Sequence, residues 1–326
     1  MHTPLSVNNV SNCLQYPWHP SVVYVKEGWN GHKWWMAQTP FPPFNLEPYR
    51  DRFELPCIHF SDDGIRWEPV PNNPIEELTN EEIEAHNYYS DPHLIFKDGR
   101  MELYYRFTFL KDRQLIGNKT LLLKRSMGDG FQWSDREVVA DLRKQEDVEV
   151  WGEQIISQAL VWREGKYRCY YVNKSSYLTS RQILFTDSQD GHDWTKYKEI
   201  ELNGGNIDPW HIDVQFYDGK YQMIVYDMNR LVWFESEDGI HFVFVSEILR
   251  PSSRRYDFYA DGLYRACSVK VNDEILVYFS ANRKKNTYIG LLSTCDRQHF
   301  KPINGESIMK WLPVIWKPLL KSIVKQ

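Results

Sequence analysis

The sequence predicts an all-β protein, a five-bladed β-propeller with four antiparallel strands in each blade. Two repeats that run in step along the chain carry this prediction. The first is a turn that opens on serine, usually carries Asp-Gly and ends on an aromatic residue, after a run of alternating apolar residues. That pattern predicts a strand, a tight turn and a new strand. Its five copies start 48 to 65 residues apart, a period typical of propellers. They are Ser61–Trp67, Ser126–Trp133, Ser188–Trp194, Ser236–Phe242 and Ser293–Phe300, the last without glycine.

The second repeat is a hairpin made of a short apolar run, a turn, and a run rich in tyrosine and tryptophan. The turn pairs Asp98-Gly99, Glu164-Gly165 and Asp218-Gly219 are strong hairpin signals. Each unit therefore offers two strands here and two around the serine turn, and five such units describe a propeller. The hairpin copies begin at His19, Asp91, Ser157, His211 and Ala266.

We expect the propeller to take residues 1–305 as one domain. Residues 1–17 should be irregular or supply a strand that closes the ring. Blade 1 then runs to about residue 75, and its proline-rich stretch FPPFNLEPYRDRFELP should form a loop over one face. Residues 76–88 are acidic and predict a short helix capped by Thr79, with Glu82 three positions on. Almost no other helix is expected in the blades, which end near residues 141, 202, 248 and 303.

Residues 306–326 form a tail of a different kind, basic and amphipathic. Lys310, Lys317, Lys321 and Lys325 would share one face of a helix, although the two prolines of this stretch would break or kink it. One interpretation is a segment that lies on a membrane surface. The alternative is a tail packed against the outer blades.

Composition excludes several classes of function. A net charge of −5 argues against a nucleic-acid partner. The start of the chain lacks a secretory signal, and no apolar run reaches the length of a membrane span. The five cysteines are scattered without a CxxC pair, so neither a metal site nor a disulfide framework is expected. We therefore expect a cytoplasmic protein without a cofactor, with peripheral membrane contact through the tail as an open possibility.

The innermost strand of each blade should line a central channel. Counting back from each hairpin turn places one residue of every blade at the mouth of this channel, and the residue two positions further on faces the same side, one layer deeper. Polar groups that converge from separate strands are the default hypothesis for a site. The mouth positions are His19, Asp91, Ser157, His211 and Arg265, and the deeper positions are Ser21, His93, Ala159, Asp213 and Cys267.

Several of these motifs resemble the five-bladed propeller glycosidases: arabinanases and xylosidases, invertases and levansucrases, and the related mannoside phosphorylases. Asp91-Pro92, the hairpin Asp218–Tyr221 and the serine turns carry the resemblance, which covers about residues 18–303. It implies a sugar substrate and three carboxylates in the channel: a nucleophile or base, an acid, and one that positions the sugar or tunes the acid.

The carboxylates of this family transfer only in part. Its first acid usually heads blade 1 within Asp-Pro, where this chain has His19-Pro20. Asp91 matches the blade 2 aspartate that holds sugar hydroxyls. The blade 3 glutamate should fall near Ser157, but the nearest acid is Glu153, and Asp213 resembles an aspartate of a later blade. The resemblance therefore implies Asp91, Glu153 and Asp213 as catalytic acids.

Each candidate has a structural alternative. Asp91 before proline could be a turn residue, and Glu153 could pair with a neighbouring loop. His19 could be a satisfied core histidine, or His19 or His211 could donate a proton. Tryptophans near the ring positions could stack on sugars or wedge blades apart. The residues expected to bind substrate are His19, His93, Trp151, Trp210, His211 and Arg265.

Three functions fit these features of the sequence. The first is an enzyme that cleaves or transfers a glycosyl unit of a glycan or oligosaccharide. The second is a non-catalytic propeller that binds a glycan, which the missing blade 1 acid favours. The third is a role in polysaccharide biosynthesis at the inner membrane surface, which the basic tail favours.

Overall fold

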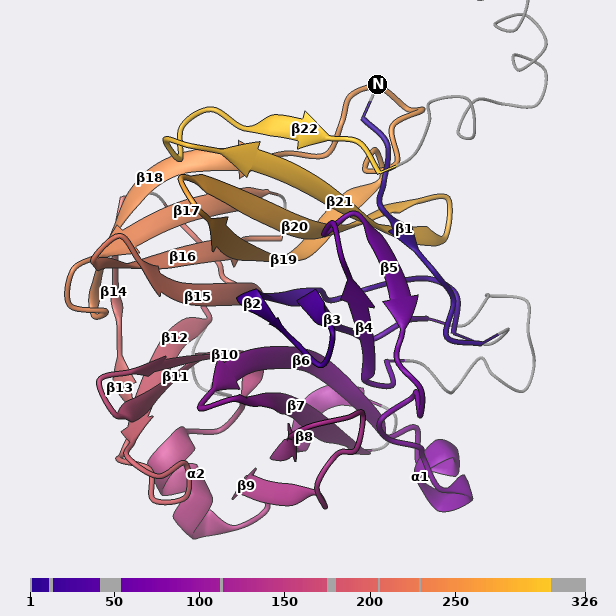
Figure 1. Ribbon diagram of the computed structural model, residues 1–326. Coiled ribbons are helices and arrows are strands. Elements are labelled where there is room, and N and C mark those ends of the chain that lie inside the picture. Colours follow the sequence, from indigo (N-terminus) through magenta and orange to yellow (C-terminus); the bar gives the residue numbers. More distant parts are fainter. Residues whose placement is uncertain are drawn as a thin grey trace, which may run out of the picture.

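The computed structural model describes residues 2–11, 14–41, 54–111, 114–174, 180–204, 206–228 and 230–305. Five sheets form the five blades, so the predicted fold is confirmed (Figure 1). The tail and most of the proline-rich loop lie outside the described residues. Among the described residues, no helix is both long and apolar enough to span a membrane.

Each blade is one sheet whose strands follow one another from the channel to the outer edge. Blade 1 holds β2 (Ser21–Trp29), β3 (His32–Gln38), β4 (Cys57–Ser61), β5 (Arg66–Pro69) and β1 (Ser6–Val7). Blade 2 holds β6 (Tyr88–Lys97), β7 (Arg100–Lys111), β8 (Gln114–Met127) and β9 (Glu137–Asp141). Blade 3 holds β10 (Ile156–Arg163), β11 (Lys166–Asn173), β12 (Gln182–Ser188) and β13 (Lys198–Glu199). Blade 4 holds β15 (His211–Tyr217), β16 (Lys220–Tyr226), β17 (Leu231–Ser236), β18 (His241–Leu249) and β14 (Glu201–Asn203). Blade 5 holds β19 (Gly262–Val271), β20 (Glu274–Arg283), β21 (Asn286–Thr294) and β22 (Lys301–Ile303). The helices are α1 (Asn80–Glu84) and α2 (Gln145–Trp151), both at the periphery (Figure 1).

Blades 1 and 4 each have a fifth strand that was not predicted. β1 pairs in parallel with β5, and β14 pairs in parallel with β18. Each added strand precedes the innermost strand of its blade in the sequence. The chain therefore runs along the outer edge of the blade first and then enters the same blade at the channel. Four antiparallel strands per blade therefore hold for blades 2, 3 and 5.

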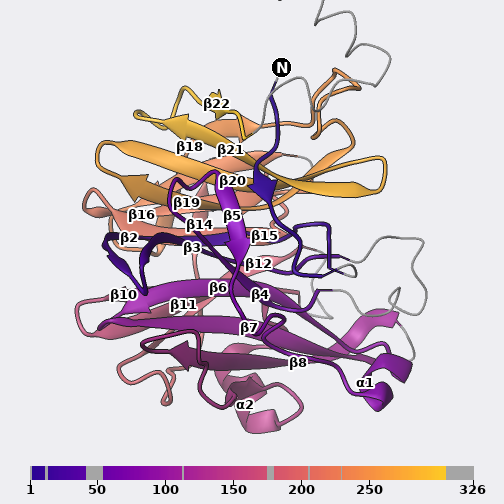
Figure 2. The same cartoon turned by 45° about the vertical axis from the view of Figure 1, so that its right-hand side comes forward.

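The first residues of the chain close the ring, which was one of the two expectations for this segment. The backbone N–H of Leu5 donates to the carbonyl of Ile289 in blade 5 at 2.8 Å, while Ser6 pairs with Arg66 in blade 1. His2 lies within hydrogen-bond distance of the carbonyl of Leu291 at 3.0 Å. We call residues 2–8, which join the first and last blades, the N-terminal clasp; Figure 2 shows β1 passing between blades 5 and 1.

The serine turns are structural, as predicted. In the fourth copy, Ser236 Oγ accepts from the backbone N–H of Gly239 at 2.9 Å, and Asp238 Oδ1 accepts from Ile240 and His241. The final copy begins one residue later than predicted. Thr294, rather than Ser293, supplies the accepting hydroxyl at 2.9 Å, and Arg297 takes the glycine position at a φ of 61°.

The helix prediction was right for α1 and missed α2. Thr79 and Glu82 form the predicted capping box, with backbone-to-side-chain bonds of 3.2 and 2.8 Å. The charged stretch RKQEDVEVW was not expected to be helical, but it forms α2. This helix has no side-chain cap, and the ring of Trp151 anchors it in the core between blades 2 and 3.

At each junction between neighbouring blades near the channel, at least one hydrogen bond joins a backbone N–H to a side chain, and five such bonds, one from each junction, form a series around the axis. Four of these bonds run from a backbone N–H of one inner strand to a side chain of the preceding inner strand, and the fifth closes the ring from blade 1 to blade 5. Because these donors and acceptors are buried, their pairing ties the blades together around the axis. The bonds are Leu94 to Ser21 (2.9 Å), Ser157 to Asp91 (3.1 Å), Ile212 to Ser157 (3.0 Å), Ser268 to Asp213 (3.0 Å) and His19 to Ser280 (2.9 Å).

Candidate functional site

The five predicted mouth residues converge on one point of the channel. Bulges interrupt the inner hairpins of blades 2, 3 and 5 beside Asp91, Ser157 and Arg265. His19, Asp91 and Ser157 also adopt positive φ angles of 56°, 52° and 52°. Bulges re-aim side chains, and these turn the mouth residues toward the axis.

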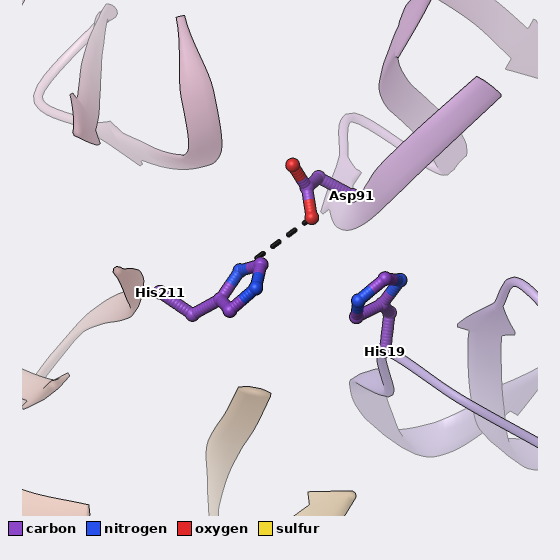
Figure 3. A group of neighbouring side chains, drawn as sticks. All are labelled: His19, Asp91 and His211. Atoms are coloured by element: carbon purple, nitrogen blue, oxygen red, sulfur yellow. Dashed lines mark ion pairs between the residues drawn. The ribbon is translucent and has the colours of Figure 1, made fainter. Parts of the chain in front are cut away.

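His19, Asp91 and His211 form the centre of this ring (Figure 3). They come from blades 1, 2 and 4, and one nitrogen or oxygen of each lies within 4.8 Å of the others. His211 Nδ1 is 3.5 Å from Asp91 Oδ1, and the two imidazole centroids are 5.3 Å apart. We call these three residues the central cluster; all are at most 2% exposed.

Asp91 is held as an anion by basic neighbours. Its Oδ2 accepts from Arg106 Nε at 2.6 Å and from the backbone N–H of Ser157. Arg265 Nη1 lies 3.9 Å from Oδ1. Burial by itself would raise the pKa of Asp91, but the positive charge of Arg106 in particular outweighs it and holds the pKa well below its usual range.

The two histidines of the central cluster are neutral bases with free nitrogens. Burial lowers the pKa of His19 to about 3 and that of His211 well below its ordinary value. His19 Nδ1 pairs with Thr39 Oγ1 at 2.7 Å, which fixes the ring and leaves Nε2 without a partner. Within the described structure, both nitrogens of His211 and Oδ1 of Asp91 also lack a hydrogen-bond partner. Buried polar atoms are rarely left unpaired, so this convergence points to an absent ligand.

The central cluster fits a divalent metal ion. Two neutral imidazoles and one carboxylate are the ligands of many zinc and iron sites, which keep further positions open. Thr39 on His19, and Arg106 on Asp91, serve as the outer partners that orient metal ligands. All three residues were predicted to lie at the mouth of the channel, but neither a metal site nor a cofactor was expected, because that expectation considered only the cysteines as metal ligands.

An aromatic wall stands beside the central cluster and was only partly predicted. The Tyr264 ring lies 4.2 Å from His211 and 5.2 Å from His19, measured between centroids, and it stacks on Trp18 at 5.0 Å. Trp210 donates from its indole nitrogen to the Tyr264 hydroxyl at 2.8 Å. Trp210, which the sequence predicted to bind substrate, thus lies beside the central cluster. Tyr264 was missed, although it directly precedes the mouth residue Arg265.

Two charged residues of the site were also missed. Arg106 stands opposite Ser90 in the β6–β7 hairpin, so the Asp98-Gly99 turn register could have indicated it. Glu54 is half-buried at a φ of 61° and interacts electrostatically with Asp91 and Arg106. Burial, together with the charge of Asp91, raises the pKa of Glu54 to about 8. Glu54 lies near the end of the proline-rich stretch of blade 1, where no strand pattern could place it.

Asp213 and His93 lie one layer beneath the central cluster, as the register indicated. Asp213 accepts from the backbone of Ser268, and its Oδ1 is 3.9 Å from His93 Nδ1. Burial raises the pKa of Asp213 to about 6 and lowers that of His93 to about 3. All five residues of this layer are at most 2% exposed, so it forms a packed floor.

The remaining predicted residues separate into two groups. Arg265 belongs to the ring, where it is 1% exposed and donates to the carbonyl of Gln158 at 3.3 Å. Trp151 is 1% exposed and packs against Tyr171 and Trp194, so its ring has no free face on which a sugar could stack. Glu153 is half-buried in the turn after α2 and is not a member of the central cluster.

Comparison with known proteins identifies the fold. No protein-family model and no curated protein sequence matches the chain. An N-acetylgalactosamine deacetylase from F. plautii, solved in complex with blood group B trisaccharide, matches with a TM-score of 0.69 and 17% identity, over 90% of this chain and 94% of that one. A β-xylosidase/α-arabinofuranosidase from a compost microbial metagenome, solved with xylotriose, matches with a TM-score of 0.61 and 12% identity, over 94% and 100%. A structure from the mannoside phosphorylase family that contains β-1,2-mannoside hydrolases matches with a TM-score of 0.57 and 12% identity, over 90% and 87%. The chain therefore has the five-bladed propeller fold of solved glycoside hydrolases, mannoside phosphorylases and a carbohydrate deacetylase.

Proposed function

We propose that this protein is a metal-assisted hydrolase that removes an acyl group from a sugar. The observation that carries the proposal is the central cluster, in which two neutral imidazoles and one carboxylate present free donor atoms within 4.8 Å of one another. A bound first-row divalent cation would satisfy these atoms and polarise the carbonyl of the substrate or acidify a water molecule.

The nature of the acids in the ring favours acyl transfer over glycoside cleavage. Glycosidase chemistry uses two carboxyl groups that flank the bond, and the five mouth positions contain only one, Asp91. That carboxylate is already engaged by Arg106 and Ser157. The F. plautii protein of the same fold is a deacetylase of an N-acetylated sugar, which supports the same reaction class here.

The other residues of the site have roles in this reaction. Water adds to the acyl carbon, and the bond from that carbon to the sugar nitrogen or oxygen breaks. Glu54 takes a proton from the water and returns it to the leaving group, since a cation beside Asp91 would lower the pKa of Glu54 and free its carboxylate. Arg265, whose Nε and Nη1 make no hydrogen bond among the described residues, stabilises the developing oxyanion. Tyr264 and Trp210 hold the sugar against the aromatic wall.

Metal binding tests the proposal without a substrate. We expect wild-type protein to bind roughly one divalent ion per chain and to melt at a higher temperature when zinc or manganese is added. His19→Ala and His211→Ala should lose both effects. His241→Ala, in an exposed turn, is the matched control and should keep them. Wild-type protein that binds no divalent ion would overturn the proposal.

Activity tests the reaction class. N-acetylated and O-acetylated glycosides should release acetate, and chelation should stop the reaction until a divalent ion is restored. Glu54→Gln should lower turnover by roughly a hundredfold or more while the metal content stays unchanged. Acetate release that persists without metal would contradict the mechanism.

Glycoside cleavage is the second candidate. It is favoured by the opposite pKa shifts of two carboxyl groups. Glu54, whose pKa is raised, could act as the general acid, and Asp91, whose pKa is depressed, could act as the ionised carboxylate. Release of a sugar from aryl glycosides, unaffected by chelation, would select this alternative. Affinity for a glycan without turnover on either panel would select the binding function.

A further inference from the structure

A basic patch lies on the same face of the propeller as the site. The innermost strand of blade 5 is β19, and the ring residue Arg265 lies close to its start. The first residue of β19, Gly262, pairs with Asn282, which lies near the end of β20. The turn between β20 and β21 comes directly after Asn282, so this turn projects from the face of the propeller that carries the site. The loop between β18 and β19 also ends at this face, because it leads into the first residue of β19. The basic patch consists of Arg254, Arg255, Arg283, Lys284 and Lys285.

The cations of the basic patch are not neutralised by ion pairs. Arg254, Arg255, Lys284 and Lys285 are exposed, and none of the five belongs to an ion pair within the described part of the chain. The carboxylate of the exposed residue Asp261 accepts from the backbone N–H of Lys284 at 2.6 Å and forms no ion pair with the patch among the described residues. The chain as a whole has a net charge of −5, so five cations without ion pairs at one edge form a positively charged surface on a negatively charged protein.

An exposed aromatic ring sits among these charges. Tyr256 is 53% exposed, and the guanidinium carbons of Arg255 and Arg283 lie 5.0 and 5.7 Å from its ring centre. Arg283 Nη1 donates to the Tyr256 carbonyl at 2.9 Å, and the Phe258 ring stacks on Phe279 beneath. The loop is therefore held in place, and a tyrosine flanked by arginines suits the boundary between water and lipid headgroups.

The last described residue of the chain, Gly305, contacts a segment that packs on the loop of this patch. His2 of the N-terminal clasp contacts Phe258 and Tyr259 of the patch loop, with centroids 5.1 and 5.9 Å apart. Gly305 packs so closely on the clasp that a Cβ there would lie 2.3 Å from the Leu5 backbone. The 21 residues that follow contain four lysines, one glutamate and two tryptophans.

We propose that this face docks on an anionic membrane surface through the basic patch and Tyr256, with the tail as a second contact. Each lysine or arginine near an anionic bilayer contributes about 1 kcal/mol, or roughly a fivefold gain in partition. Two weak signals together are what stable peripheral binding requires. Docking in this orientation would present the mouth of the channel to the headgroup layer. The proposal does not depend on the hydrolase mechanism, and a failed vesicle experiment would leave that mechanism standing.

Sedimentation of the full chain with vesicles tests the proposal. We expect binding to vesicles of phosphatidylcholine mixed with phosphatidylglycerol, little binding to phosphatidylcholine alone, and loss of binding in high salt. Arg254→Glu combined with Lys284→Glu and Lys285→Glu should weaken the partition by roughly a hundredfold or more. The matched control variant reverses the charge of three residues at hairpin turns of the opposite face and should bind vesicles like wild type. Its substitutions are Lys33→Glu, Arg100→Glu and Lys166→Glu. Thermal melts should show that both triple variants are folded.

Three outcomes would overturn the proposal. The first is equal binding to neutral and anionic vesicles. The second is a triple variant of the basic patch that binds like wild type, with binding lost only on deletion of residues 306–326, which would assign the contact to the tail alone. The third is a protein that binds a soluble polyanion such as heparin but no vesicle, which would make the basic patch a site for an acidic glycan.

Discussion

Arg106 and Asp91 form a buried ion pair in which Nε of Arg106 lies 2.6 Å from Oδ2 of Asp91. Their side chains are 12% and 0% exposed. The pair leaves Oδ1 of Asp91 free to face His211, so it both preserves the charge of the carboxylate and selects which oxygen faces the central cluster.

Breaking this pair should be costly at neutral pH. Arg106→Gln removes the closest cation from the buried carboxylate of Asp91 and should lower the free energy of unfolding by about 3 kcal/mol or more. The pKa of Asp91 is lower in the folded protein than in the unfolded chain, where it is about 4. The ionised carboxylate therefore stabilises the fold fully above about pH 4, and this stabilisation is lost as the pH falls below that value toward the folded pKa. Urea unfolding of wild type and variant should therefore converge as the pH falls below about 4. Arg106→Lys should recover part of the loss, and a pH-independent difference would contradict the charge argument.

Asp213 should behave in the opposite way. Its folded pKa of about 6 lies above the unfolded value of about 3.9, so wild type should lose stability, about 3 kcal/mol, as the pH rises from 4 to beyond 6. Asp213→Asn should remove that loss, whereas Asp129→Asn, in an exposed turn, should follow wild type. Asp213→Asn should also keep its metal, and Asp91→Asn should not. Loss of metal in both variants would show that Asp213 also contributes to metal binding.

The bonds between blades can be tested with a pair of buried serines. Ser157 Oγ accepts from the backbone of Ile212 at 3.0 Å, so Ser157→Ala leaves that N–H unpaired and should cost about 2 kcal/mol. Ser90 is equally buried, but its hydroxyl has no partner among the described residues. Ser90→Ala should therefore be nearly neutral, and equal losses in chemical denaturation would refute the role of the Ser157 bond.

The contact of Gly305 with the N-terminal clasp predicts a steric effect. A Cβ on Gly305 would lie 2.3 Å from backbone atoms of Pro4 and Leu5, which cannot move as a flexible side chain can. Gly305→Ala should lower the free energy of unfolding by about 2 kcal/mol. A Cβ on Gly128 would meet nothing within 4 Å, so Gly128→Ala serves as the control. Equal melting temperatures for the two variants would contradict the tight packing.

The sequence was sufficient for the fold and for the mouth positions, because both depend on local signals. Turn pairs such as Asp98-Gly99 set the register of a hairpin, and the register alone carries Asp91 and His211 to the channel. The same counting placed Asp213 on the correct face.

The sequence could not show how deeply a side chain is buried or which of its polar atoms are hydrogen-bonded. Trp151 precedes a strand as Trp210 does, but the unpredicted helix α2 carries it into the core. Glu54 lies near the end of the proline-rich stretch of blade 1, which has no periodicity. The donor set of the central cluster depends on which nitrogens remain unpaired, and only coordinates contain that information.

The N-terminal clasp has a consequence for biosynthesis. Its residues are synthesised well before their partners in blade 5, which run from Ile289 to Asn304. Domains generally gain structure during synthesis from the amino end, so blades 1 to 4 can pair their strands while the clasp still waits for blade 5. The ring, and with it the approach of His19 to His211, can therefore be completed only after blade 5 has been translated.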